Sequence, residues 1–384
     1  MEEKSKVALA KCEEYKEENV LKSLSNLFNL LGGIELFAKK GDKILLKPNL
    51  LGDAAPEKSV TTHPVVIAAI SQILKDFGAK IFLGDSPAIQ PFGKVLKKTG
   101  MEDVIKKYEI TTVQFKTPNT KHKEENQILK NITLAKEIED FDSIFNMCKL
   151  KTHMLMHFTG AVKNMYGCMP GLIKSEIHLR VPDQVLFAHA VLDIYDTIRP
   201  QISIMDGIVG MEGPGPNNGT PKKIGVLLAS KDGLALDSTA LRIIGQDPMK
   251  VPTIFFGNQR KIGIVENSQI EILGENISNF IVNDFKMPKI ERDFLPFPVF
   301  VNKWIRKNVT RSPKIKSNCT LCGQCQKICP ANAISPNEGK RMNINLSKCI
   351  RCFCCMEVCP HHAIYSKEHA LSQFFDFLKK NLNR

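Results

Sequence analysis

The chain reads Cys319-Thr-Leu-Cys322-Gly-Gln-Cys325-Gln-Lys-Ile-Cys329-Pro330 and then Cys349-Ile-Arg-Cys352-Phe-Cys-Cys355-Met-Glu-Val-Cys359-Pro360. Both runs have the spacing C-x2-C-x2-C-x3-C-P, with which bacterial ferredoxins hold cubane iron–sulfur clusters. Three thiolates at this spacing wrap one cluster, and the fourth, followed by proline, reaches the other. The repeated run predicts two [4Fe–4S] clusters in a small α+β bacterial-type ferredoxin domain, and with them single-electron chemistry at low potential.

The crossing of the fourth cysteine assigns the eight ligands to two sets. The first cluster takes Cys319, Cys322, Cys325 and Cys359. The second cluster takes Cys349, Cys352, Cys355 and Cys329. Zinc sites use four ligands rather than eight in interleaved sets, and disulfide frameworks belong to secreted chains. Cys354 is a ninth cysteine inside the second run, and we expect it to be a packing residue.

Length and composition indicate a globular protein of two or three domains. The chain has 384 residues, of which 43% are hydrophobic and 24% are charged, as in ordinary soluble proteins. It contains no run of eighteen apolar residues, so we expect no membrane span. The sequence begins Met-Glu-Glu-Lys-Ser-Lys and lacks the apolar stretch of a signal peptide. Together with oxygen-sensitive clusters, these features predict a cytoplasmic location.

The net charge of +13 is concentrated near the cysteines. From Arg311 onward, 12 Lys and Arg residues stand against 4 Asp and Glu residues. Because a cluster with four thiolates is an anion, it offsets part of this positive charge. The remainder suits docking to an acidic electron-carrier protein of the ferredoxin or flavodoxin type. Nucleic acid is the minor alternative for a basic segment, and we expect none to bind.

Residues 1–293 alternate between strand and helix patterns, which predicts an α/β domain with a mostly parallel sheet and flanking helices. We expect strands at Lys6–Lys11, Lys43–Lys47, Lys80–Leu83, Ser143–Met147, Gln201–Met205 and Ile224–Ala229. We expect helices at Glu17–Phe37, Pro64–Phe77, Asp183–Ile198 and Ala235–Ile244. A linker at 294–315, the ferredoxin domain at 316–366 and a C-terminal helix at 367–384 follow.

Polar side chains follow several predicted strands, at the edge where ligands bind in parallel α/β sheets. The candidate catalytic residues are His153, Lys163 and Lys151, because ammonium groups bind anions and imidazole transfers protons near neutral pH. Candidates for binding a substrate or cofactor are Asn164, Asp85, Asp206, Glu212 and His178. For the aspartates, helix capping or turn formation is an equal alternative.

Several motifs together resemble one known family. They are Lys-Leu-Lys-Thr-His at 149–153, Thr-Gly-Ala-Val-Lys-Asn-Met-Tyr-Gly at 159–167, Gly-Asp-Ser-Pro at 84–87 and Asp-Gly-Ile-Val-Gly-Met-Glu-Gly-Pro-Gly-Pro at 206–216. They resemble the family catalogued as domain of unknown function 362, whose members often carry a C-terminal two-cluster ferredoxin. The resemblance covers roughly residues 5–290. It implies this pairing of domains but no particular substrate, because the family is largely uncharacterised.

A fainter similarity concerns the central segment His153-x9-Lys163-x6-Pro170-Gly171-x6-His178. It is similar to the stretch of nickel-pincer lactate racemases that holds their cofactor. In that family the matching His is an acid/base residue, the Lys is joined to the pincer nucleotide and the later His ligates nickel. The similarity implies that these three residues share a pocket. Because a racemase has no need of iron–sulfur clusters, we expect a shared fold rather than nickel.

The sequence therefore predicts an iron–sulfur oxidoreductase in which electrons pass from the clusters to a small polar or anionic substrate, with His153 as proton donor. The alternative hypothesis is a non-catalytic electron carrier or cofactor-maturation protein. A pincer-type isomerase is the third hypothesis. No Gly-x-Gly-x-x-Gly follows a predicted strand, so a Rossmann dinucleotide site is not indicated. A flavin or a further metal is left open by the sequence.

Overall fold

The computed structural model describes residues 4–87, 89–171, 173–288, 311–337 and 341–367. These residues divide into two compact units. The first unit comprises the described residues up to 174 together with 188–288, and the second comprises 175–187 together with the described residues from 311 onward. Among the helices that the structure describes, none is long and apolar enough to cross a membrane.

A nine-stranded sheet forms the centre of the first unit, in the order β11-β1-β10-β9-β7-β2-β3-β4, with β8 paired to β7. Its strands are β1 (Ser5–Lys11), β2 (Lys43–Pro48), β3 (Lys80–Asp85), β4 (Thr111–Gln114), β7 (Ser143–His153), β8 (His157–Thr159), β9 (Ile202–Glu212), β10 (Thr220–Ser230) and β11 (Ile270–Gly274). Strands β9, β7, β2, β3 and β4 are parallel, whereas β10 runs antiparallel to both β9 and β1. The predicted α/β fold with a mostly parallel sheet is confirmed. A hairpin of β5 (Pro118–His122) and β6 (Asn131–Ala135) lies outside this sheet.

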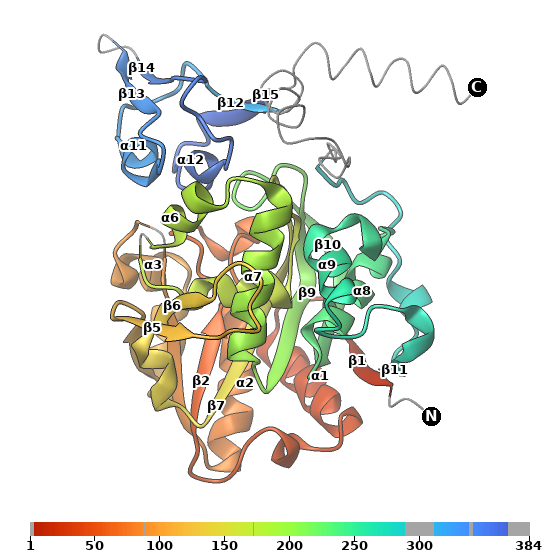
Figure 1. The fold of residues 1–384 in the computed structure, drawn as a ribbon. Coiled ribbons are helices and arrows are strands. Elements are labelled where there is room, and N and C mark those ends of the chain that lie inside the picture. Colours follow the sequence, from red (N-terminus) through yellow and green to blue (C-terminus); the bar gives the residue numbers. More distant parts are fainter. Residues whose placement is uncertain (1–3, 88, 172, 289–310, 338–340, 368–384) are drawn as a thin grey trace, which may run out of the picture. The chain divides into compact units, whose positions relative to one another are not determined.

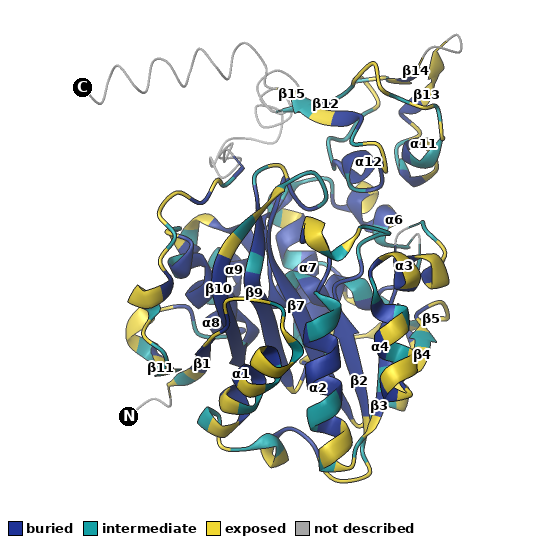
Figure 2. Cartoon of the chain, turned by 180° about the vertical axis from the view of Figure 1, so that it is seen from behind, coloured by how far each residue is buried: buried dark blue, intermediate teal, exposed yellow. Residues whose placement is uncertain are grey.

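Helices cover both faces of the sheet. One face carries α1 (Glu17–Leu30), α2 (Pro64–Phe77) and α4 (Met101–Tyr108), as Figure 2 shows. The other carries α7 (Gln184–Ile198), α8 (Gly233–Ile243) and α9 (Pro252–Gln259), in front of the sheet in Figure 1. Shorter helices are α3 (Phe92–Lys98), α5 (Ala161–Asn164) and α6 (Ile173–Arg180). A large apolar core packs α1 and α2 onto the sheet through Leu24, Ile67 and Phe145, among others.

Three elements differ from the sequence expectation. The first helix ends at Leu30 rather than Phe37, because Gly32 and Gly33 follow with φ of +98° and +103°, a conformation that stops a helix. Strands β7 and β9 continue to His153 and Glu212, so Lys149 and Lys151 lie within a strand and not in a loop. The polar edge of the site is thus built largely on rigid strand backbone.

The second unit contains two small antiparallel pairs of strands. Strand β12 (Ser312–Ile315) pairs with β15 (Ile364–Lys367), and β13 (Ile334–Asn337) pairs with β14 (Arg341–Ile344). Short helices α11 (Gln324–Ile328) and α12 (Cys354–Glu357) lie within the two cysteine runs. Residues 312–315 were expected to be part of a linker, but their pairing with β15 makes them part of this unit. The remainder of the expected linker up to 310, and the helix expected after Lys367, lie outside the described residues.

The two cysteine runs repeat each other in backbone conformation as well as in sequence. Left-handed φ values recur in three matched pairs, which are Leu321 and Arg351 (59° and 58°), Gly323 and Phe353 (74° and 61°), and Asn332 and His362 (47° and 48°). A left-handed conformation costs a residue with a side chain about 1–2 kcal/mol. The same turns are therefore retained in both runs against a conformational cost, and they direct equivalent cysteines in equivalent ways.

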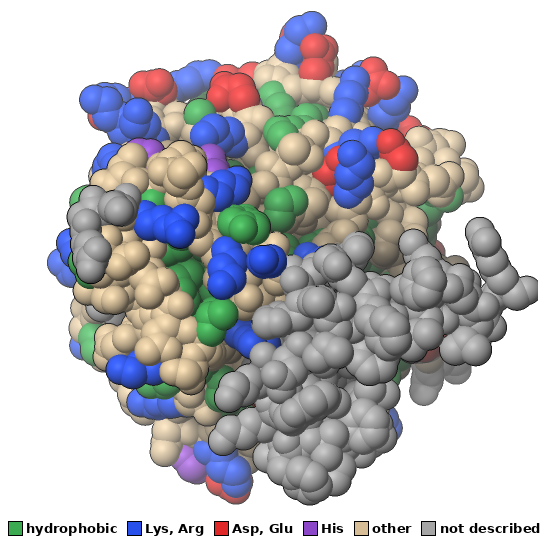
Figure 3. Space-filling view, turned by 90° about the horizontal axis from the view of Figure 1, so that it is seen from above, with side chains coloured by type: hydrophobic (Ala, Val, Ile, Leu, Met, Phe, Trp, Pro, Cys, Tyr) green, Lys and Arg blue, Asp and Glu red, His purple; other side chains and the backbone are tan. Residues whose placement is uncertain are grey.

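The sequence carries a net charge of +13, and part of its Lys and Arg side chains can be seen on the face drawn in Figure 3. Among the described side chains drawn in Figure 3, Lys and Arg are dispersed over the face rather than gathered at one point. Such a distribution acts mainly through the overall field of the molecule.

Candidate functional site

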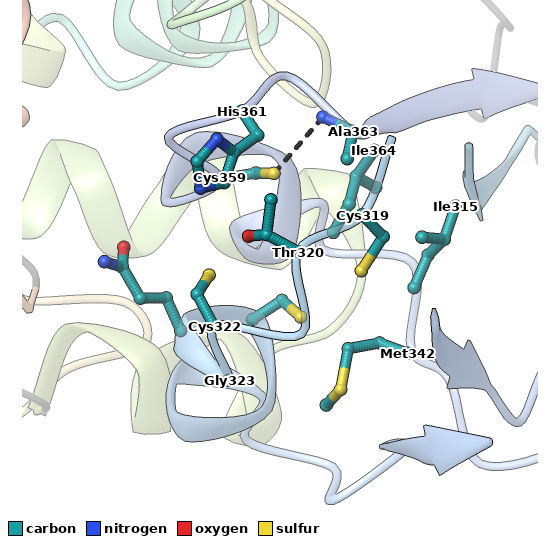
Figure 4. A pocket seen from close by; sticks show the side chains of 12 residues that line it. Ile315, Cys319, Thr320, Cys322, Gly323, Met342, Cys359, His361, Ala363 and Ile364 are labelled. Atoms are coloured by element: carbon teal, nitrogen blue, oxygen red, sulfur yellow. Dashed lines mark hydrogen bonds between the residues drawn. The ribbon is translucent and has the colours of Figure 1, made fainter. Parts of the chain in front are cut away.

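Four cysteines from both runs line one hollow in the second unit (Figure 4). They are Cys319, Cys322, Cys325 and Cys359. In the close-up the sulfurs of Cys319, Cys322 and Cys359 point toward the same space, which Met342 and Ile364 border with apolar atoms. The backbone N–H of Ala363 donates a hydrogen bond to Sγ of Cys359 at 3.3 Å.

The other four cysteines line a second hollow in the same unit. They are Cys329, Cys349, Cys352 and Cys355. The backbone N–H of Ala333 donates to Sγ of Cys329 at 3.3 Å, which repeats the contact of the first hollow. Cys354 is buried and also borders this hollow. The eight cysteines thus fall into the two sets of four that the sequence predicts, and their role as ligands stays a prediction.

The chemistry of both hollows fits iron–sulfur clusters. Each offers four sulfur donors, an apolar border and a backbone N–H aimed at one sulfur, which are features that hold and tune such clusters. Burial raises the pKa of Cys325 to about 11 and raises that of Cys355 well above its usual value. These thiols therefore release their protons when a cation binds. Within the described residues, no group of three or more His, Cys, Asp or Glu side chains is placed to hold a single metal ion.

A buried ion pair stands at the carboxyl ends of β2 and β3 in the first unit. Nζ of Lys47 lies 2.9 Å from Oδ1 of Asp85, and both side chains are almost fully buried. Asp85 also accepts hydrogen bonds from the backbone N–H groups of Leu50 and Ser86, each at 2.8 Å. Gly167 covers the pair so closely that a Cβ there would lie 2.4 Å from Nζ of Lys47. Only glycine fits at this position without displacing the pair.

Asn164 and Asn49 connect this pair to Lys151, because Nζ of Lys47 also donates to Oδ1 of Asn164 at 3.5 Å. Nζ of Lys151 donates to Oδ1 of Asn49 at 2.9 Å and to the carbonyl oxygen of Val60 at 2.7 Å. Nδ2 of Asn49 in turn donates to Oδ1 of Asn164 at 3.0 Å, and Nδ2 of Asn164 donates to Oδ1 of Asn146 at 2.7 Å. Lys151 is only 1% exposed. Its ammonium therefore positions the Asn49 amide.

The opposite face of the sheet holds a second buried ion pair. Nζ of Lys149 lies 2.7 Å from Oδ2 of Asp206 and donates to the hydroxyl of Tyr15 at 2.9 Å. The Tyr15 hydroxyl donates to Oδ1 of Asp206 at 2.8 Å, and its ring stacks on His63 with 3.6 Å between centroids. Burial, together with the Asp206 carboxylate, raises the pKa of Tyr15 well above its usual value. Burial lowers the pKa of His63 to about 4, so this imidazole is neutral at physiological pH.

The two histidines His153 and His157 face each other where β7 turns into β8. Nδ1 of His153 accepts the backbone N–H groups of Leu155 and Met156 at 3.1 and 3.2 Å. Because Nδ1 accepts, the neutral ring carries its proton on Nε2. His157 has a left-handed φ of 63°, and burial lowers its pKa to about 4, with His153 contributing. His153 therefore shapes the turn and keeps Nε2 as its proton-bearing atom.

Lys163 belongs to α5 and is partly exposed. Its ammonium lies 5.5 Å from the centroid of the Tyr166 ring, within the range of a cation–π contact. The Tyr166 hydroxyl donates to the carbonyl oxygen of Lys174 at 2.6 Å. The Lys174 ammonium donates to the carbonyl oxygen of Ser86, next to Asp85.

A buried carboxylate from α8 holds the helix that carries Lys163 and Asn164. Oδ1 and Oδ2 of Asp237 accept the backbone N–H groups of Ala161 and Val162 at 2.6 and 3.1 Å. Burial raises the pKa of Asp237 to about 7. The orientation of α5 therefore depends on a residue far away in the sequence.

Two predicted site residues, Glu212 and His178, make their described contacts outside the buried networks around Lys47 and Lys149. Oε2 of Glu212 accepts the backbone N–H of Lys286 at 2.9 Å, beyond the far end of β9. His178 lies in the second unit, where its ring stacks on Phe187 with 4.2 Å between centroids. By contrast, Asp85 and Asn164 join one buried network, while Asp206 belongs to the network on the other face.

Several side chains of these networks were not predicted from the sequence, among them Lys47, Tyr15, Asp237 and Lys174. Lys47 lies within a short strand pattern and Tyr15 lies beside one, so neither is distinguished from an ordinary strand residue. Asp237 lies within an ordinary helix pattern. Lys174 follows the motif-rich segment directly and was the one that proximity to Lys163 could have indicated. The others carry no local signal, because their partners are distant in the sequence.

Residues 44–242 match the family described as domain of unknown function (DUF362). This chain belongs to that family. Residues 318–363 match the 4Fe-4S dicluster domain, so this DUF362 protein carries a ferredoxin-type iron–sulfur module. The predicted family and the predicted C-terminal module are both confirmed.

Two known proteins are similar to this DUF362 protein. Thylakoid-associated protein sll1697 of Synechocystis sp. is 33% identical over 286 residues, which are 74% of this chain and 88% of the relative. The lactate racemase apoprotein from Thermoanaerobacterium thermosaccharolyticum matches with a TM-score of 0.37 and 14% identity, over 63% of this chain. This chain spans 57% of the racemase chain. The expected distant likeness to lactate racemases is therefore found, and it is too weak to carry an argument about nickel or racemisation.

Proposed function

We propose that this chain is an iron–sulfur oxidoreductase that passes single electrons to a small anionic substrate or cofactor at the polar edge of the α/β unit. The observation that carries the proposal is the division of eight cysteines between two hollows of four. When bound, two [4Fe–4S] clusters would supply low-potential one-electron carriers. The residues of this chain would hold them through thiolates and through the N–H groups of Ala333 and Ala363.

Paired cysteine substitutions test the assignment of ligands. The variant Cys322→Ser/Cys359→Ser removes two ligands of the first hollow, and we expect about four of about eight irons to remain. The variant Cys322→Ser/Cys329→Ser removes two cysteines of one run but one from each hollow, and we expect loss of both clusters. Iron analysis and electron paramagnetic resonance after anaerobic reconstitution distinguish them. The reverse pattern would mean that each run holds its own cluster.

The α/β unit supports an anionic substrate through its lysines. Lys163 and Lys174 are partly exposed at the edge where Lys47 pairs with Asp85. We propose that Lys163 binds the anionic group, that Lys151 positions the edge through Asn49, and that His153 supplies a proton from Nε2. A two-electron reduction of a carbon centre consumes two electrons and two protons, so a proton donor beside the substrate is needed.

Reoxidation of the reduced protein tests this part of the proposal. The reconstituted protein is reduced under anaerobic conditions and mixed with carboxylate and phosphate metabolites while cluster absorbance is followed. We expect one class of anion to reoxidise it, and we expect Lys163→Met to slow the reaction at least about tenfold. Lys116→Met, an exposed lysine of the same unit, is the matched control. If no anion reoxidises the protein, the non-catalytic carrier is the better description.

We further propose an acidic carrier protein as electron donor and a reducing, cytoplasmic location. Cys322 is exposed, so the first hollow reaches the surface of its unit. Lys327 is exposed in α11 between two predicted ligands, Cys325 and Cys329. A negatively charged partner would be attracted to this neighbourhood.

A further inference from the structure

Lys174 occupies an unusual position at the polar edge. Its ammonium donates to the carbonyl oxygen of Ser86, and it forms no ion pair among the described residues. Ser86 is itself fixed, because its Oγ accepts the backbone N–H of Gly171 at 2.8 Å. The backbone of Lys174 is held by the Tyr166 hydroxyl at 2.6 Å. The side chain is thus fixed at both ends, at the amine and at the backbone, and Lys174 as a whole residue is partly exposed.

The surroundings of this amine disfavour its protonated form. The pKa of Lys174 is lowered to about 8, chiefly because burial disfavours the charged form. The Asp85 carboxylate opposes this shift, and the ammonium groups of Lys47 and Lys163 add to it. Asp85 already forms an ion pair with Lys47 at 2.9 Å. Its negative charge is therefore largely balanced by Lys47 rather than by Lys174. A lysine that is desolvated and lies next to other cations is the arrangement by which proteins activate an amine as a nucleophile.

We propose that Lys174 is a nucleophilic lysine that forms an imine with a carbonyl compound bearing an anionic group. The inference rests on the proposed use of this edge as a ligand site and adds a residue and a substrate class to it. Lys163, partly exposed at the same edge, supplies the positive charge for the anionic group. A 2-oxo acid combines the two required functions in the smallest molecule.

The covalent step needs only the groups present and the substrate. The lone pair of neutral Nζ attacks the carbonyl carbon, and one proton passes from the nitrogen to the carbonyl oxygen to give a carbinolamine. The second N–H proton leaves with the hydroxyl group in the water that is lost next. This intermediate loses water as its C–O bond breaks, and a C=N bond to Lys174 forms. Neither oxidation nor reduction takes place, and hydrolysis reverses the step with the same balance of atoms.

Reductive trapping tests the proposal on the cluster-reconstituted full chain. The protein is incubated with pyruvate and cyanoborohydride, which converts an imine to a stable secondary amine, and the labelled lysines are mapped by peptide mass spectrometry. Acetone, which lacks the carboxylate, is the matched probe. With pyruvate at pH 7 we expect labelling at Lys174 to exceed that at exposed Lys116 about tenfold or more, because far more of its amine is neutral.

Three variants make the outcome decisive. Lys174→Arg is expected to remove the preferred label while preserving the positive charge. Lys163→Met is expected to reduce labelling by pyruvate more strongly than labelling by acetone, because only pyruvate carries the carboxylate. Lys116→Met is expected to change neither. Equal labelling of Lys174 and Lys116 in the folded wild-type protein would overturn the proposal. Because trapping requires no electron transfer, its failure and the failure of the reoxidation experiment are separate results.

Discussion

Lys47, Lys149 and Lys151 are among the largest fully buried side chains of the described structure. Lysine is rarely buried without a partner, because removing an ammonium from water costs several kcal/mol. Two of the three are paired with aspartates, and the third donates to Asn49 and Val60. Such pairs seldom add much stability, but breaking one leaves an uncompensated charge. The polar edge is therefore sensitive to changes that remove only one member of a pair.

Gly167→Ala tests how tightly the Lys47–Asp85 pair is enclosed. The new methyl group would lie 2.4 Å from Nζ of Lys47 and 2.5 Å from Oδ1 of Asp85, so the pair must shift. We expect a loss of about 1–3 kcal/mol in the free energy of unfolding, measured by urea denaturation of the α/β unit's far-ultraviolet signal. Gly93→Ala is the control, because nothing lies within 4 Å of a Cβ there, and it is expected to be neutral or slightly stabilising.

The buried neutral His157 predicts acid sensitivity. Its pKa is lowered to about 4 in the folded chain, against about 6.5 for an exposed histidine, so the unfolded chain binds the proton more readily. The stability that the folded chain gains from keeping His157 neutral is fully present above pH 6.5 and is lost as the pH falls toward 4. This loss amounts to about 3 kcal/mol in the free energy of unfolding. His157→Asn removes the titration, and asparagine tolerates the left-handed φ of 63°. We expect urea midpoints to fall less steeply between pH 6.5 and 4 in this variant, and an unchanged slope would contradict the prediction.

At the scale of elements, the four-residue helix α5 depends on α8 for its orientation. Asp237 accepts two backbone N–H groups of α5, and Gly160 lies so close that a Cβ there would be 2.1 Å from Oδ1 of Asp237. A helix this short has little stability of its own. The placement of Lys163 and Asn164 is thus a property of the contact between two helices.

Asp237→Ala is expected to release α5 without unfolding the sheet. Above its pKa of about 7, Asp237 is a charged acceptor. Hydrogen bonds to a charged acceptor contribute about 1.5–3 kcal/mol each, and two are lost in this variant. We expect faster hydrogen exchange at the amides of Ala161 and Val162, together with weaker labelling of nearby Lys174 by pyruvate. Exchange at Leu234 and Ala235, whose amides are capped by Asp232, serves as the internal control. Unchanged protection of the α5 amides would show that Asp237 does not hold the helix.

The elements predicted best from the sequence were those with a local cause. Helix α2 begins at Pro64 and ends at Phe77 as expected, because proline suits the first turn and Gly78 with φ +91° ends it. The cysteine runs were equally clear, since their spacing is a chemical requirement. The strand expected at Ser143–Met147 ends too early, before Lys149 and Lys151, because buried cations in a strand interrupt the apolar pattern by which a strand is recognised. Their partners lie far away, as Tyr15 does at 134 residues from Lys149.

At the scale of the whole molecule, we expect the charge distribution to govern the encounter with the proposed acidic electron donor. The sequence carries a net charge of +13, and the cysteine-bearing end holds an excess of Lys and Arg. We expect the rate of reduction by an acidic carrier to fall as ionic strength rises. Lys327→Glu is expected to lower both the rate and its salt dependence, whereas Lys116→Glu leaves them nearly unchanged. Stopped-flow measurement at several salt concentrations checks this, and equal effects of both variants would refute a specific docking face.

The crossing of Cys329 and Cys359 between the hollows also bears on how the protein is made. The first hollow needs Cys359, so a growing chain that has synthesised only the first run presents three of its four sulfurs. Strand β12 precedes both runs and pairs with β15, which follows them. This pair of strands likewise cannot form until β15 has been synthesised. Neither hollow has its four cysteines until the second run has left the ribosome. At the proposed cluster sites, iron delivery would therefore follow translation of the module, and both sites would become ready at almost the same moment.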